Sequence, residues 1–401
     1  MKLLLGQGAQ DATPAYLNIG GAHAALICGK RGSGKSYTLG VLVEELLAGA
    51  AGDIIPILVD PMGVYHTMVQ ANAAQQESLF QWGLSAKGFP VRLLSPGQPA
   101  ALYDPEVLVA LAQRGVQVVP LQLNPSDLSP DGWCDLFDAD INKPLGIALF
   151  RAAQRLQRQE RPYTIPDLIQ TVERDGKAND ASKEALLNRL EAARGWHIFS
   201  EAEYRPTPEL FVPGVVNVLD LSRLEPGGRG LRNLTVSIIA RNLFRARSDA
   251  RLREEFGLAS PLPRIWMLID EAHQFIPKGA STLAKDQLIR WAKEGRQPGL
   301  SLAVASQQPS AIDPEVLSQC DIILSHKLTS RDDVLALNSL SQDYMGGELR
   351  TFIRSLSRTG EAVMVNDEME TVQMLRIRPR RSAHGGSSLP PEEENTLDIW
   401  Q

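Results

Sequence analysis

The sequence predicts an α/β fold with a mostly parallel β-sheet and a helical subdomain inserted into it. Short, continuously apolar runs alternate with segments of helical composition along most of the 401 residues. This alternation is the pattern of parallel strands that helices cover on both faces. The first apolar run leads directly into a glycine-rich turn and then into a helix. Between residues 103 and 204 helical periodicity dominates, and this change of pattern indicates the insertion.

The elements follow one another in a simple order. Residues 1–21 carry few helical signals and are expected to be a short lead-in to the first strand. The expected strands are His23–Cys28, Ile54–Val59, Val91–Leu94, Val116–Leu123, Val215–Leu221, Ile265–Ile269, Leu300–Ala305, Ile322–Leu324, Ala362–Val365 and Val372–Ile377. Helices are expected at Tyr37–Leu47 and Leu234–Phe256, and in the insertion one is expected to begin at an N-cap, Asp180, and to end at Gly195.

These elements divide the chain into four parts. The core would be formed by residues 1–102 and 205–381, and residues 103–204 would form the helical insertion. Residues 382–401, rich in glycine, serine, proline and glutamate, are expected to be a disordered tail.

Composition and charge narrow the class of protein. The chain is 43% hydrophobic and 22% charged, as is typical of globular proteins, and its net charge of −6 provides no global basic field for nucleic acid. The three cysteines lack metal-ligand spacing, which fits a reducing compartment. The apolar run at Leu3–Leu5 is too short for a signal peptide, and no run has the length of a membrane span. A cytoplasmic protein without a membrane anchor is therefore expected.

The turn after the first strand has the complete pattern G-x-x-x-x-G-K-[ST] from Gly29 to Ser36. Strand, glycine-rich turn and helix in this order are the context that a P-loop requires, because backbone N–H groups and the helix N-terminus together bind phosphate. The phosphate-binding residues would be Gly29, Gly32, Ser33, Gly34, Lys35 and Ser36. Lys35 would contact the β- and γ-phosphates of ATP, and Ser36 would bind Mg²⁺.

A second motif lies where the strand Ile265–Ile269 ends in Asp270 and Glu271. Together with a P-loop, four apolar residues followed by two acids have the form of a Walker B motif. Asp270 would then bind Mg²⁺, and Glu271 would orient and polarise the attacking water. A glutamate in this position favours hydrolysis over binding alone.

Other polar segments allow more than one interpretation. Gln307 follows the strand Leu300–Ala305 and would reach the γ-phosphate or the water, although a turn-forming polar cluster explains it equally well. Two loops are candidates for DNA contact: one with Arg223, Arg229 and Arg232, and the other from Lys278 to Lys285.

With these motifs placed, the chain resembles the HerA–FtsK superfamily of ring-forming P-loop motors, and HerA-type ATPases in particular. The matching segments, in order, are GKRGSGKSYTLG, VDPMGVY, PGVVNVLDLSRL, IDEAHQFIP, KEGRQPGLSLAVASQQPSAIDPEVLSQC, TGEAVMV and RIRPRR. The resemblance implies a RecA-like core and a hexameric ATPase that moves double-stranded DNA, commonly for a partner nuclease in end processing or anti-phage defence. It also implies a γ-phosphate sensor at Gln307 and a trans-acting arginine finger at Arg296.

The chain departs from the family pattern in two places. Met62 and Val64 replace the usual His and Glu after the second strand. Only 28 residues precede Gly29, so the family's N-terminal β-barrel, which helps to dock the nuclease, is not expected. Two other functions therefore stay open: a conjugation or secretion ATPase, and a regulatory scaffolding ATPase whose nucleotide state gates a partner effector without translocation.

Overall fold

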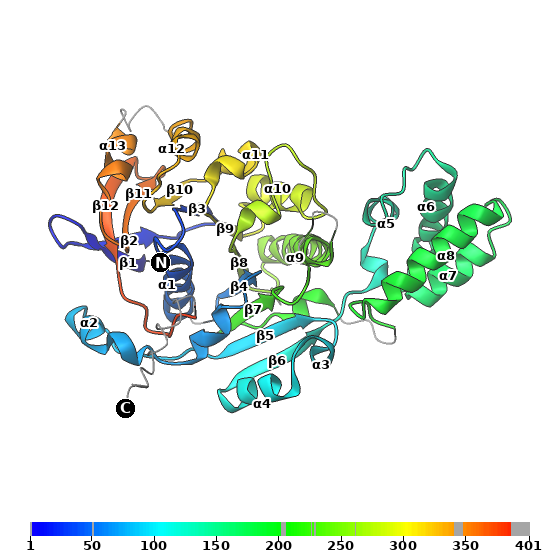
Figure 1. Ribbon diagram of the computed structural model, residues 1–401, viewed down its shortest axis with the longest axis horizontal. Helices are drawn as coiled ribbons and strands as arrows, with labels where there is room; N and C mark the ends of the chain where they lie inside the picture. The colour runs from blue at the N-terminus through cyan, green and yellow to red at the C-terminus, as the bar shows by residue number, and fades with distance from the viewer. Residues whose placement is uncertain are drawn as a thin grey trace, which may run out of the picture.

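A single twelve-stranded sheet organises the protein (Figure 1). The computed structural model describes residues 2–49, 52–201, 206–225, 227, 230–260, 262–340 and 348–385. The strand order is β2-β1-β12-β11-β10-β3-β9-β8-β4-β7-β5-β6, and the part from β10 to β6 is parallel throughout. The strands are β1 (Lys2–Gly8), β2 (Pro14–Asn18), β3 (Ala24–Cys28), β4 (Ile54–Asp60), β5 (Val91–Pro96), β6 (Val116–Leu121), β7 (Val216–Asp220), β8 (Arg264–Ile269), β9 (Leu300–Ser306), β10 (Ile322–Ser325), β11 (Glu361–Asn366) and β12 (Thr371–Ile377).

The central strands are buried on both faces, as their continuous apolar runs predict. Every residue of β3, β4, β7 and β9 is buried. Because these strands are parallel, their carboxyl ends lie at one edge of the sheet, which is where ligands bind in open α/β folds. The predicted α/β fold with a mostly parallel sheet is confirmed.

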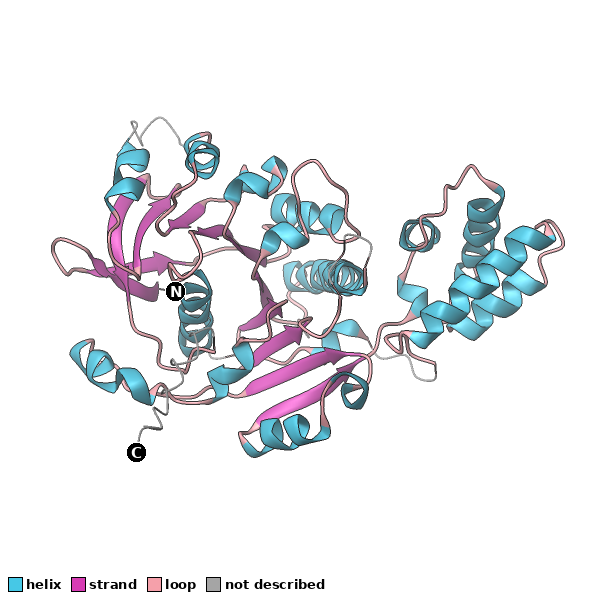
Figure 2. Ribbon diagram, viewed as in Figure 1, coloured by secondary structure: helices cyan, strands magenta, loops and turns pink. Residues whose placement is uncertain are grey.

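Helices cover both faces of the sheet (Figure 2). On one face, α1 (Lys35–Gly49) and α4 (Pro105–Gln113) pack in one hydrophobic cluster. Helices that follow β7 in the chain pack in the cluster on the other face. They are α9 (Leu231–Glu255), α10 (Lys285–Glu294), α11 (Pro314–Leu317), α12 (Arg331–Asn338) and α13 (Glu348–Ser355). Two short helices, α2 (Gln76–Gln81) and α3 (Pro99–Leu102), complete the core.

The insertion is a four-helix unit beside the sheet, at the right of Figure 1. Its helices are α5 (Pro130–Leu136), α6 (Pro144–Gln157), α7 (Ile165–Glu173) and α8 (Asp180–Gly195). They enclose their own core around Trp133, Leu149 and Leu186, which extends to Leu234 and Ile238 of α9.

The insertion begins later than the expected residue 103. Both α4 and β6 belong to the main core, because β6 pairs with β5 and places Val116 opposite Val91. The expected N-cap of α8 is also displaced by one residue. Asn179, not Asp180, accepts the capping hydrogen bond, from Ser182 N at 2.8 Å.

The two ends of the chain differ from expectation. Residues 1–21 contain the antiparallel pair β1–β2, which extends the sheet beyond β12, instead of a simple lead-in. Ser382, expected to begin a disordered tail, is fully buried against α1. Residues 386–401 of the expected tail lie outside the described residues. Among the helices that are described, none combines the length and apolar character needed to cross a bilayer.

Candidate active site

The glycine-rich turn between β3 and α1 has the backbone conformation of a phosphate-binding loop. Gly29 has φ +153° and Gly34 has φ +115°, values that side chains other than glycine rarely adopt. A Cβ atom on Gly29 would also lie 2.6 Å from Cβ of His326, which packs beneath the turn. Lys35 begins α1, and its Nζ donates to Lys30 O at 3.2 Å.

The two acids after β8 lie next to this loop and are almost completely buried, with exposed fractions of 1% for Asp270 and 8% for Glu271. A hydroxyl, Tyr65 Oη, donates to Asp270 Oδ2 at 2.9 Å. Gln307, at the end of β9, donates from Nε2 to Glu271 Oε1 at 2.6 Å. The sequence-predicted residues Lys35, Asp270, Glu271 and Gln307 therefore meet at the carboxyl edge of three neighbouring strands.

Burial shapes the electrostatics of this cluster. It lowers the pKa of Lys35, and the carboxylates of Glu271 and Asp270 oppose that shift. Burial raises the pKa of Asp270, whereas hydrogen bonds from the side chains of Ser36 and Tyr65 lower it. The charged form of Lys35 is thus favoured by the nearby carboxylates of Glu271 and Asp270.

The residues present fit a divalent cation and a water molecule. The Ser36 hydroxyl and the Asp270 carboxylate are oxygen donors of the kind that Mg²⁺ prefers. Within the described part of the chain, Glu271 Oε2 is buried without a hydrogen-bond partner, and it lies 3.5 Å from His273 Nδ1. A buried carboxylate oxygen normally has a partner, so this atom marks a place where a ligand or water would bind.

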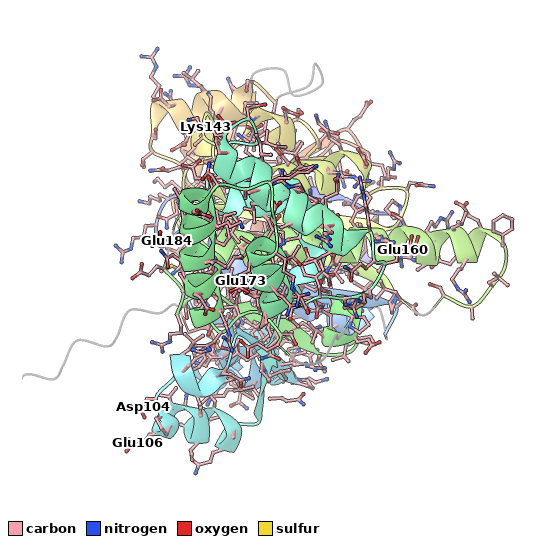
Figure 3. All side chains as sticks on the ribbon, turned by 90° about the vertical axis from the view of Figure 1, so that its right-hand side faces the viewer. Asp104, Glu106, Lys143, Glu160, Glu173 and Glu184 are labelled. Carbon is pink, nitrogen blue, oxygen red and sulfur yellow. The ribbon has the colours of Figure 1, made fainter. Side chains whose placement is uncertain are left out.

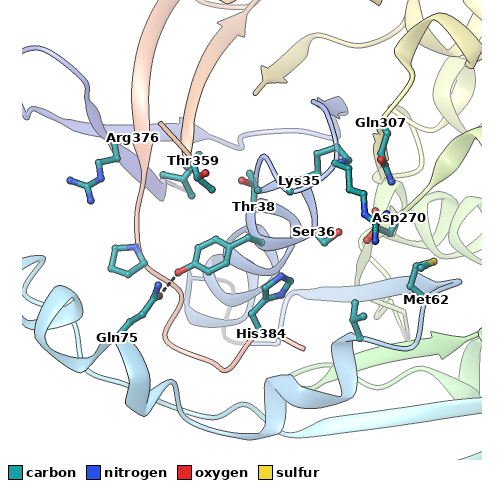
Figure 4. A pocket seen from close by; sticks show the side chains of 18 of the residues that line it. Lys35, Ser36, Thr38, Met62, Gln75, Asp270, Gln307, Thr359, Arg376 and His384 are labelled. Atoms are coloured by element: carbon teal, nitrogen blue, oxygen red, sulfur yellow. Dashed lines mark hydrogen bonds between the residues drawn. The ribbon is translucent and has the colours of Figure 1, made fainter. Parts of the chain in front are cut away.

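One cavity of about 590 Å³ is lined by Lys35, Ser36, Asp270, Glu271 and Gln307. This volume lies within the usual range for small-molecule sites. Figure 4 shows Lys35, Ser36, Asp270 and Gln307 on one side of the cavity. Thr359, Arg376 and His384, from the C-terminal part of the chain, lie on the other side. The lining comprises Arg31, Gly32, Gly34, Lys35, Ser36, Tyr37, Thr38, Met62, Val64, Gln75, Ser78, Trp82, Asp270, Glu271, Gln307, Thr359, Gly360, Arg376, Ile377, Pro379 and His384.

Arg296 does not belong to this cavity. It is exposed in the loop between α10 and β9, at the amino end of β9, whereas Gln307 follows the carboxyl end. The seven residues of β9 separate the two by about 20 Å at ~3.3 Å per residue. Arg296 therefore cannot act on the nucleotide of its own chain, and its role in trans stays a prediction.

The sequence reasoning missed two positioning residues. Tyr65 is fully buried in the VDPMGVY segment, where Asp60 Oδ2 accepts from its backbone N at 3.0 Å. His326 follows β10, and its ring nitrogens lie 2.9 Å from Thr38 Oγ1 and 2.8 Å from Glu361 O. A signal existed for both: His326 directly follows the buried strand β10, and Tyr65 lies in the segment that follows the buried strand β4.

The candidate DNA loops offer fewer free cations than expected. Arg232 is buried and donates to Leu224 O at 2.6 Å and to Gln274 Oε1 at 3.1 Å, so it is not available to DNA. Lys285 forms an ion pair with Asp313 at 2.7 Å. Arg229 lies outside the described residues, and Lys278 is exposed.

Comparison with known proteins identifies the family. The family model described as "Helicase HerA, central domain" matches residues 4–243, which is more than half of the chain. The chain belongs to the HerA helicase family. The resemblance inferred from the ordered motifs is thereby confirmed.

The relatives match only part of their own length. The DNA double-strand break repair helicase HerA of Sulfurisphaera tokodaii is 25% identical over 304 residues, which are 70% of this chain and 58% of that protein. The HerA of Sulfolobus acidocaldarius is 26% identical over 304 residues, 71% of this chain and 59% of its own length. This HerA-family chain thus spans somewhat more than half of the length of these two relatives.

A solved structure shares the fold. VirB4 of Thermoanaerobacter pseudethanolicus superposes with a TM-score of 0.54 at 15% identity, over 94% of this chain and 96% of that one. At this identity the likeness concerns the fold alone, and it agrees with a RecA-like P-loop core.

Proposed function

We propose that this HerA-family protein binds ATP and Mg²⁺, hydrolyses ATP, and uses the energy to translocate double-stranded DNA. The observation that carries the proposal is the contact of Gln307 with Glu271 beside Asp270 and Lys35, in a cavity that begins at the phosphate-binding turn. An acid, an amide and a P-loop lysine in one buried cluster are the groups that NTP hydrolysis requires.

Each side chain has a task that its surroundings allow. The backbone N–H groups of the turn and Lys35 would bind the phosphates. Ser36 and Asp270 would hold Mg²⁺, which neutralises charge on the phosphates when it is bound. Glu271 would accept a hydrogen bond from the attacking water through Oε2, while Gln307 fixes the other carboxylate oxygen. The sensor role of Gln307 would follow from this contact, since a displaced amide releases the carboxylate.

We further propose that the active unit is a ring, with hexameric symmetry as the leading hypothesis. Arg296 is exposed and lies about 20 Å from its own cavity, which supports a role in the site of a neighbouring subunit. A head-to-tail contact that repeats in this way closes into a ring when the rotation permits.

A partner nuclease or other effector, in DNA end processing or anti-phage defence, would dock on the helical insertion. The insertion has its own core and projects from the sheet, so it can present a rigid surface. Charged side chains such as Lys143, Glu160, Glu173 and Glu184 extend from its outer face (Figure 3). These charges would favour a polar contact with the partner.

The test compares ATP hydrolysis with and without linear double-stranded DNA in the wild type and in Glu271→Gln. We expect DNA to stimulate the wild type, and Glu271→Gln to lower turnover by about 10²–10⁴, the usual effect of a general base. ATP binding should remain within a few-fold, because the amide keeps the size of the side chain. Glu294→Gln changes an exposed residue at the end of α10; it is the matched control and should hydrolyse ATP normally.

Other outcomes would change the assignment. Normal turnover in Glu271→Gln would remove Glu271 from the mechanism. If the wild type hydrolyses ATP at a rate that DNA does not change, the regulatory scaffolding ATPase is favoured. The contacts of Arg232 with Leu224 O and of Lys285 with Asp313 support this alternative, because they occupy two cations expected to bind DNA.

A further inference from the structure

The segment that follows β12, residues 378–385, crosses the P-loop helix and is here called the strap. β12 is antiparallel to β11, which is antiparallel to β10, so β12 delivers the strap to the same sheet edge as the P-loop. The strap is anchored on Glu44 of α1, whose side chain is fully buried. Arg378 Nη1 donates to Glu44 Oε2 at 2.9 Å, and Ser382 N donates to Glu44 Oε1 at 2.8 Å. Moving the strap away would leave the buried Glu44 carboxylate unpaired, which is costly, so these contacts hold the strap on α1.

A glycine in α1 makes room for the strap. Gly40 is an unfavourable residue for a helix interior, and a Cβ atom there would lie 2.5 Å from the guanidinium carbon of Arg380. The guanidinium therefore lies directly against the helix backbone. The backbone N–H of Arg380 donates to Tyr37 Oη at 2.6 Å. Tyr37 Oη in turn donates to Gln75 Oε1 at 2.7 Å.

The strap and Tyr37 together line the end of the cavity that the phosphate-binding groups leave open. Pro379 and His384 belong to the same cavity as Lys35. The rings of Tyr37 and His384 meet edge to face, with centroids 5.6 Å apart and an interplanar angle of 81°. In Figure 4 the ring of His384 is directed toward Ser36.

His384 can donate a hydrogen bond to a ligand. Arg380 Nη1, which can only donate, lies 3.1 Å from His384 Nδ1, so Nδ1 accepts and the ring proton is on Nε2. Burial, together with the charge of Arg380, lowers the pKa of His384 to about 4. The ring is therefore neutral at physiological pH, with one donor and one aromatic face.

We propose that Tyr37, Pro379 and His384 form the nucleoside subsite of this cavity, so that the strap holds the base and ribose while the P-loop holds the phosphates. Aromatic and prolyl faces suit the flat, apolar face of a base, and a single neutral donor suits a ring nitrogen or a ribose hydroxyl. The cavity of about 590 Å³ extends from Lys35 to these residues without a break. This inference rests on the proposed function, because it names the part of the ATP molecule that each end of that site recognises.

The test separates the nucleoside from the phosphates by using two probes, ATP and inorganic tripolyphosphate, in calorimetric binding experiments with Mg²⁺. We expect His384→Ala and Tyr37→Ala each to weaken ATP binding by about tenfold, the value of one good contact, while tripolyphosphate affinity stays within twofold. Tyr37→Phe keeps the ring and should lose less than Tyr37→Ala. CTP serves as a third probe, since a smaller base should lose part of the contact.

Arg381→Ala is the matched control from the same strap. Its side chain bonds Ser85 O at 3.1 Å, outside the cavity, so both affinities should stay unchanged. Equal weakening of ATP and tripolyphosphate in His384→Ala would mean that the strap only supports the P-loop, and the subsite would be refuted. Unchanged ATP affinity in His384→Ala and Tyr37→Ala would refute it as well. These measurements report binding and need neither hydrolysis nor DNA. They would therefore still test the nucleoside subsite if the protein proved not to translocate DNA.

Discussion

Replacing His326 with asparagine should destabilise the protein in a way that depends on pH. His326 is fully buried beneath the P-loop. The Glu361 carbonyl can only accept, so Nδ1 carries the proton and Nε2 accepts from the Thr38 hydroxyl. Asparagine can still donate to Glu361 O, but it cannot reach Thr38. Loss of one hydrogen bond that leaves a buried hydroxyl unpaired should lower the free energy of unfolding by about 1–3 kcal/mol at pH 7.5.

The pH dependence follows from the pKa of the imidazole. Burial lowers the pKa of His326 from 6.5 to about 4. A depressed pKa means that the folded state favours the neutral ring. The associated stability is therefore complete above pH 6.5 and is lost as the pH falls toward 4. Between pH 7.5 and pH 5.0 the wild type should lose about 2 kcal/mol through this group alone.

Urea unfolding of both proteins at pH 7.5 and pH 5.0 measures the two effects. His326→Asn should be clearly less stable than the wild type at pH 7.5 and nearly equal to it at pH 5.0. His66→Asn is the control, because His66 is only partly buried and bonds Gly63 O at 3.0 Å. If His326→Asn shows the same deficit at both pH values, the neutral, buried imidazole is not a source of stability and the reasoning fails.

Two further predictions concern hydrolysis. Tyr65→Phe removes the hydroxyl that donates to Asp270 at 2.9 Å. In steady-state kinetics it should slow ATP turnover by about tenfold, while the directly measured ATP affinity stays within threefold. Undiminished turnover would show that Asp270 does not need this hydrogen bond. Arg296→Ala should reduce turnover by about 10³ or more, and mixing it with Lys35→Ala subunits should restore part of the activity. A mixture that co-assembles without any rescue would argue against a role in trans.

The sequence was sufficient to predict the parallel part of the sheet and the residues that meet beside the P-loop. Continuous apolar runs located β3, β4, β8 and β9, since strands buried on both faces leave an unambiguous pattern. The site residues follow those strands directly. Parallel strands bring their carboxyl ends together, so Lys35, Asp270 and Gln307 had to converge once the strands were adjacent.

The two regions that local composition predicted wrongly, Ser382 and the pair β1–β2, are stabilised by contacts with segments far away in the sequence. Ser382 is polar and precedes a stretch rich in glycine and serine, so it reads as the start of a tail. It is buried because Glu44, 338 positions earlier, needs hydrogen-bond donors. The pair β1–β2 escaped notice for a similar reason, because β1 is stabilised by pairing with β12 near the other end of the chain. Local composition carries no record of such partners.

The register between β4 and β8 ties the family-matched segment to the remainder of the site. The match to the HerA central domain ends at residue 243, before Asp270 and Glu271. In the sheet, Val59 lies opposite Ile269, so the loop after β4 and the acids after β8 leave the sheet side by side. Tyr65, held by Asp60, reaches Asp270 across 205 positions of sequence. A shift of one residue in this pairing would turn the side chains of β8 to the opposite faces and break that contact. The position of Asp270 and Glu271 therefore depends on the matched segment through sheet geometry, even though both acids lie outside it.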